Sequence, residues 1–162
     1  MLFRSETLKG AQTYLLIGNG AALFLLALAL GGRVAPGATE RDLAIPFVGV
    51  TAPTFTAAVM ALGIYLLSGL MALRFASHRR EIEKQVSGTL LAAALTYPTM
   101  LTTGKKTATC AALLPVLLQI GALMVSFPNK RGGALAAALL CSAPYLVLVL
   151  DLWKPRKTHD KG

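Results

Sequence analysis

The chain has 162 residues, of which 55% are hydrophobic and 14% are charged, and its formal net charge is +9. Soluble domains average about 25% charged residues, so this chain has too few charges to cover the surface of a soluble domain of its size. Its basic residues flank apolar stretches instead of lining one face, which argues against nucleic-acid binding. The composition therefore predicts an all-α fold class, a polytopic bundle of helices that cross a lipid bilayer.

The first predicted span covers residues 14–30 and follows two basic residues, Arg4 and Lys9. A secretory signal peptide also begins with positive charge, but its apolar core is about 7–15 residues long, shorter than this one. We therefore expect a retained span. Residues 31–52 are rich in glycine and proline and predict an extracytoplasmic loop, with residues 45–50 near the membrane surface.

The second predicted span covers residues 53–75, with Thr51 as a possible helix cap and Pro53 in the first turn. The charged run that follows must lie in water, so residues 76–106 are expected to be cytoplasmic or interfacial. Within that segment, apolar residues recur every three or four positions near 82–103. This pattern predicts a short amphipathic or re-entrant helix, and a fifth crossing is the alternative.

The third and fourth predicted spans cover residues 108–127 and 134–152, joined by a tight polar turn at 128–133. A basic tail, residues 153–162, ends the chain. With four crossings, twelve of the sixteen Lys and Arg residues fall on the side of the termini and four on the other side. With five crossings the division is equal. The positive-inside rule therefore favours four spans with cytoplasmic N- and C-termini, in a bacterial inner membrane or alternatively an organelle membrane.

Basic residues beside the spans are expected to set the orientation and to contact anionic lipid head groups. The residues predicted for this role are Arg79, Arg80, Lys105, Lys106, Lys154, Arg156 and Lys157. Helices in lipid associate through small residues that allow close approach. The residues predicted to pack in this way are Gly18, Ala22, Ala134, Ala138 and Ser142.

Three polar residues lie inside or at the edge of the spans: Asn19, Gln119 and Asp151. Such residues are functional candidates by default. We expect Gln119 to hydrogen-bond between helices, for example to Asn19, to a hydroxyl or to another subunit. Asp151 lies in the last turn, where a local pairing with Lys154 is the simpler expectation than a proton relay. Pro115 and Pro144 interrupt the last two spans, and their apolar neighbours favour structural kinks over an ion site.

The sequence contains no recognisable catalytic, cofactor-binding or metal-binding motif. His78 and Glu81 lie one turn apart but have no further ligand nearby, so no metal, cofactor or catalytic residue is predicted. These features favour a non-enzymatic accessory or scaffolding subunit that binds other membrane subunits or copies of itself. A small transporter or a self-associating, holin-like pore is the second hypothesis. A membrane-bound lipid-modifying or redox enzyme, with Cys110 and Cys141 as its only redox candidates, is the third.

Overall fold

The computed structural model describes residues 2–31, 42–44, 51–85 and 105–153 of the chain. Helices dominate this part, and two short strands precede the second helix. The elements in chain order are α1 (Leu2–Leu30), β1 (Asp42–Ala44), β2 (Thr51–Pro53), α2 (Thr54–Gln85), α4 (Lys105–Ser126), the 3₁₀ turn η1 (Pro128–Lys130), α5 (Arg131–Cys141) and α6 (Ala143–Trp153).

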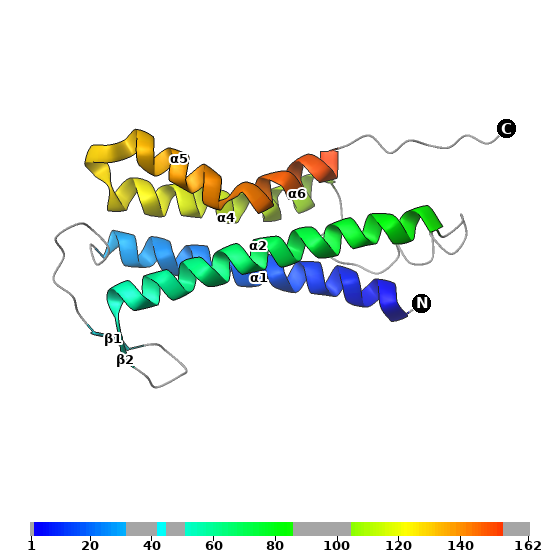
Figure 1. Ribbon diagram of the computed structural model, residues 1–162, viewed down its shortest axis with the longest axis horizontal. Coiled ribbons are helices and arrows are strands. Elements are labelled where there is room, and N and C mark those ends of the chain that lie inside the picture. The colour runs from blue at the N-terminus through cyan, green and yellow to red at the C-terminus, as the bar shows by residue number, and fades with distance from the viewer. Residues whose placement is uncertain (1, 32–41, 45–50, 86–104, 154–162) are drawn as a thin grey trace.

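The long helices lie side by side along one axis (Figure 1). Helices α1 and α2 are antiparallel, because Phe75 of α2 packs near Gly10 at one end and Ala58 shares a buried cluster with Leu28 at the other. Helix α4 runs parallel to α1, since Asn19 reaches Ala111 while Leu26, further along α1, lies near Gly121. Helix α2 therefore ends where α4 begins. We call this end of the bundle the basic end and the opposite end the hairpin end.

The last predicted span, 134–152, is not one straight helix but two, α5 and α6, bent by 60° at their junction. Pro144 has no N–H to donate to the carbonyl of Leu140, and helical hydrogen bonding resumes where Tyr145 and Leu146 donate to the carbonyl of Ser142. The pair nevertheless follows the whole length of α4. It starts just after α4 ends, and Trp153 Nε1 donates to Thr109 Oγ1, in the second turn of α4, at 2.9 Å.

Within the described residues, three helical segments are long and apolar enough to cross a membrane: Lys9–Leu30, Thr54–His78 and Lys106–Ser126. The bent α5–α6 pair adds a fourth if it is counted as one span. The predicted charged segment after the second span is a continuation of α2 to Gln85, because its residues are good helix formers. The predicted interfacial helix falls mostly on residues 86–103, which lie outside the described residues.

The predicted loop at 31–52 contains a small antiparallel ladder that pairs Asp42 with Pro53, Leu43 with Ala52 and Ala44 with Thr51. The prediction of Thr51 and Pro53 at the start of the helix was therefore wrong, because both lie in β2 and α2 begins at Thr54. The predicted polar turn at 128–133 is also shorter than expected, since α5 already begins at Arg131.

The interior of the bundle is built mainly from small residues, and the large aliphatic side chains point outward. Ala22, Ala72, Ala112 and Ala138 are fully buried, whereas Leu140 is 77% exposed. Other exposed large residues include Leu30, Phe55, Leu117 and Leu150. A soluble protein buries its leucines, and this reversed arrangement lets the helix backbones approach closely. Close approach brings the few interior polar groups within hydrogen-bonding distance.

Candidate functional site

Two tyrosines and two serines form a buried polar cluster where α2 meets α6. Tyr65 and Tyr145 are fully buried and their ring centroids are 4.9 Å apart. The Tyr65 hydroxyl is 2.7 Å from Ser142 Oγ, and the Tyr145 hydroxyl is 2.8 Å from Ser68 Oγ. Tyr65 and Ser68 of α2 are three residues apart, and Ser142 and Tyr145 at the α5–α6 junction have the same spacing with the residue types in reverse order.

Backbone carbonyls complete the hydrogen bonding of this Tyr–Ser cluster. Ser68 Oγ and the Tyr145 hydroxyl both lie 2.9 Å from the carbonyl oxygen of Tyr65. The Tyr65 hydroxyl reaches the carbonyl of Pro115 on α4 at 3.4 Å. Each hydroxyl carries one proton and accepts through its oxygen, so these contacts satisfy the buried groups without a charge. The cluster ties α2, α4 and the α5–α6 junction together.

Two glycines make room for the ring of Tyr145. A Cβ atom at Gly69 would lie 2.7 Å from Tyr145 Cε2, and one at Gly18 would overlap the Tyr145 hydroxyl and approach Ser68 Oγ to 2.8 Å. Neither glycine is therefore replaceable without moving a buried, hydrogen-bonded tyrosine. In contrast, a Cβ at Gly20 or Gly63 on the same two helices would meet nothing within 4 Å.

Asn19 joins α1 to the proline-containing turn of α4. Pro115 has no N–H, which leaves the carbonyl four residues earlier, that of Ala111, without its helical partner. Asn19 Nδ2 donates to this carbonyl at 3.3 Å and to Leu15 O of its own helix at 2.8 Å. Helix α4 continues through Pro115 unbroken. The asparagine therefore supplies the hydrogen bond that the proline removes.

Gln119 is buried, at 2% exposure, and its Oε1 atom has no hydrogen-bond partner in the described part of the chain. The Oδ1 atom of Asn19 is also buried and has no hydrogen-bond partner among the described residues. Among the described residues, Asn19 bonds to the Ala111 carbonyl and not to Gln119, so the two predicted amides do not pair. Two acceptor atoms are thus available inside the bundle for a donor, and unpaired buried acceptors are costly.

The other predicted residues fall into three groups. Gly18, Ala22, Ala134, Ala138 and Ser142 are all buried between helices of the chain itself. Asp151 is half-buried in α6, whereas Lys154, Arg156 and Lys157 lie outside the described residues, as does the predicted Asp151–Lys154 pairing. Lys106 is exposed at the start of α4, Lys105 begins that helix, and Arg79 and Arg80 lie in the last turns of α2.

The interior supports hydrogen bonding more readily than acid–base chemistry. Among the residues that the structure describes, no three His, Cys, Asp or Glu side chains gather as a metal site. Cys110 is exposed and Cys141 is half-buried, and both are free thiols. The buried polar side chains of the described ranges are hydroxyls and an amide, which can bind a small polar ligand or a water but do not act as bases near neutral pH.

The prediction of site residues did not include Tyr65, Ser68 or Tyr145. Each is an isolated hydroxyl residue within a long apolar segment, and such a segment is interpreted as a membrane span. The available signal was the pair of complementary patterns Tyr-x-x-Ser and Ser-x-x-Tyr at 65–68 and 142–145. Such patterns place two hydroxyls on one helix face one turn apart.

Comparison of the chain with protein-family models, with curated proteins and with solved structures finds no match.

Proposed function

We propose that the chain is an integral membrane protein with four crossings, the α5–α6 pair forming the fourth, and with both termini in the cytoplasm. The charge distribution supports this orientation, because with four crossings twelve of the sixteen basic residues belong to sequence segments on the side of the termini. The helix directions agree with it, since α2 ends and α4 begins at the basic end (Figure 1). A bacterial inner membrane is the proposed location.

Reporter fusions test this topology. A fluorescent protein that folds in the cytoplasm, fused after residue 162 or before residue 1, should be bright in both cases. Alkaline phosphatase fused within residues 32–41 should be active, because this enzyme needs the oxidising periplasm. An active phosphatase at either terminus would contradict the proposal.

We further propose that the chain is a non-enzymatic accessory or scaffolding subunit of a larger membrane complex. The observation that carries this proposal is the Tyr–Ser cluster, whose hydroxyls bond to one another and to backbone carbonyls and so connect neighbouring helices. The interior polarity is used to hold helices. Because the small residues Ala134, Ala138 and Ser142 are buried inside the bundle, a partner would contact the outward leucines of α5 or the polar ends.

Affinity purification in two mild detergents of different chemistry tests the subunit proposal. The same additional membrane subunit should co-purify in constant ratio in both detergents, and an unrelated tagged membrane protein should not retain it. Recovery of this chain alone in each detergent would contradict the proposal.

A small transporter is the second candidate, and one specific observation favours it. Transporters build binding sites at broken helices with polar side chains nearby. The break at Ser142 has such company from α2, namely Tyr65 and Ser68, and the bundle also holds the unpartnered Gln119 Oε1. A self-associating pore has less support, because a pore needs a wettable face and the hydroxyl residues Thr54 and Ser68 of α2 are buried. Flux assays on proteoliposomes distinguish these roles, because a scaffolding subunit gives no flux above protein-free vesicles.

A further inference from the structure

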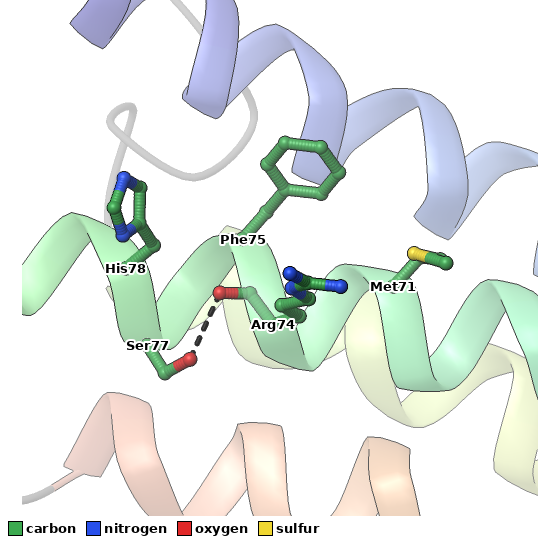
Figure 2. Close-up of a pocket in the computed structure, with 5 residues that line it drawn as sticks. All are labelled: Met71, Arg74, Phe75, Ser77 and His78. Carbon is green, nitrogen blue, oxygen red and sulfur yellow. Dashed lines mark hydrogen bonds between the residues drawn. The ribbon is translucent and has the colours of Figure 1, made fainter.

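An open hollow of about 450 Å³ lies on α2 at the basic end, lined by Met71, Arg74, Phe75, Ser77 and His78 (Figure 2). Figure 2 shows Phe75 pointing toward α1, and this ring stacks on Tyr14 with centroids 5.6 Å apart. The apolar wall of the hollow is therefore held in place by α1.

The polarity of the hollow changes along α2. The apolar side chain of Met71 lies nearest the middle of the bundle, and Ser77 and His78 lie furthest toward the basic end. A hydrocarbon core of about 30 Å takes about 20 helical residues, which from Thr54 extends close to Arg74. Trp153, 61% exposed and bonded to Thr109, marks the same end of the bundle with a side chain typical of the membrane interface.

Arg74 brings a charge to this boundary. In the part of the chain that the structure describes, its guanidinium forms no ion pair. The Ser77 hydroxyl donates to the carbonyl of Arg74 at 2.8 Å, and its oxygen still accepts a further bond. A guanidinium offers several N–H donors in a fixed plane, which suits a phosphate better than a lysine does. Charge and polarity together favour an anionic, phosphate-containing ligand with an apolar part.

We propose that this hollow binds one anionic phospholipid of the cytoplasmic leaflet. Arg74 binds the phosphodiester, Ser77 and His78 contact the polar head group, and the acyl chains follow Met71 and Phe75 toward the hydrocarbon core. The inference rests on the membrane placement proposed above. It adds a defined lipid site to the general attraction between basic residues and anionic membranes.

Native mass spectrometry of the full chain in detergent tests the site, with dioctanoyl phosphatidylglycerol as the probe. Dioctanoyl phosphatidylcholine and inorganic phosphate serve as comparisons. The phosphatidylglycerol adduct should form preferentially, and Arg74→Gln should weaken its binding about tenfold, as expected for loss of a charge-assisted hydrogen bond. Lys106→Gln is the matched control, because it removes one exposed positive charge at the same end but outside the hollow. This control should change binding less than about twofold, since exposed distant charges are screened.

A second variant, Ser77→Asp, places a carboxylate three residues from Arg74 and should weaken phosphatidylglycerol binding to a similar degree. Circular dichroism checks that each variant keeps its helices. Equal binding of the two lipids, equal loss in Arg74→Gln and Lys106→Gln, or equally tight binding of inorganic phosphate would each overturn the lipid site. If the chain proved extractable without detergent, the membrane placement would fail first, whereas a detergent-dependent chain with no lipid preference would refute the site alone.

Discussion

Gly18 and Gly69 illustrate how a missing side chain sets the geometry of a buried site. Each lies against the Tyr145 ring, and the absence of two Cβ atoms allows α1 and α2 to enclose that ring together. The hydroxyl of Tyr145 then lies within hydrogen-bonding distance of Ser68 Oγ and the Tyr65 carbonyl. At the residue scale, the site thus depends on vacant space as much as on polar groups.

Substitution of Gly18 by alanine is expected to destabilise the bundle by about 1–3 kcal/mol, the usual cost of overpacking a tight interior. Gly20→Ala is the control, because a Cβ there meets nothing within 4 Å. It should be neutral or stabilising by up to about 1 kcal/mol, since alanine favours the helix. Thermal unfolding in one detergent, followed by circular dichroism, compares the two. Equal midpoints would contradict the close approach at Gly18.

Removal of the Tyr145 hydroxyl tests the hydrogen bonds of the Tyr–Ser cluster. Tyr145→Phe should cost about 0.6–2 kcal/mol, the range found for hydrogen bonds between membrane helices. Tyr14→Phe makes the same chemical change at a half-buried ring that stacks on Phe75. It should change the free energy of unfolding in detergent by no more than about 0.5 kcal/mol, as for changes away from buried contacts. A larger loss for Tyr14→Phe than for Tyr145→Phe would refute the assignment.

At the scale of the elements, α1 and α4 are coupled through the backbone defect at Pro115. A double-mutant cycle of Asn19→Leu and Pro115→Ala measures this coupling. Pro115→Ala restores an N–H that can satisfy the Ala111 carbonyl, so Asn19→Leu should cost less in that background, by about 0.5–1.5 kcal/mol. Thr13→Val, which removes a hydroxyl bonded only to Lys9 O of the same helix, should show no coupling to Pro115. Strict additivity for Asn19 would contradict the proposed role.

The long helices were predictable from the sequence, because a run of apolar residues long enough to cross lipid has few other uses. The bounds expected for α4 differ from those observed by at most a few residues. The 60° break at Ser142 was harder to predict, because Pro115 and Pro144 have similar apolar surroundings in the sequence. Helix α4 continues through Pro115, whereas α5 ends before Pro144. The difference depends on partners from other helices: Asn19 completes the turn at Pro115, and Tyr65 holds Ser142.

The short β1–β2 ladder and the Tyr–Ser cluster were missed for a related reason. Strands β1 and β2 have three residues each, which is too short to show an alternating apolar pattern, and a segment rich in glycine and proline predicts a loop. The cluster unites residues 77 positions apart in the chain, so its members become recognisable only when the helix directions are known.

At the scale of the whole molecule, the outward leucines and the position of Trp153 define where the bilayer should end. Trp153 is the chain's one tryptophan, so its fluorescence reports a single depth. In vesicles, lipids brominated near the carbonyl group should quench it more strongly than lipids brominated near the chain ends, because tryptophan prefers the interface. Stronger quenching by the deep bromines would place α6 lower in the membrane than proposed. Acrylamide, a quencher that stays in the aqueous phase, is the complementary control.

The pairing of Tyr65 with Ser142 and of Ser68 with Tyr145 also restricts how the bundle can move. Both bonds connect α2 to the first residues of the α5–α6 junction, so an axial slide of α6 along α2 would rupture both at once. A rearrangement that keeps both bonds must therefore leave α6 in its present register on α2, so that only α5, on the other side of Ser142, is outside this constraint.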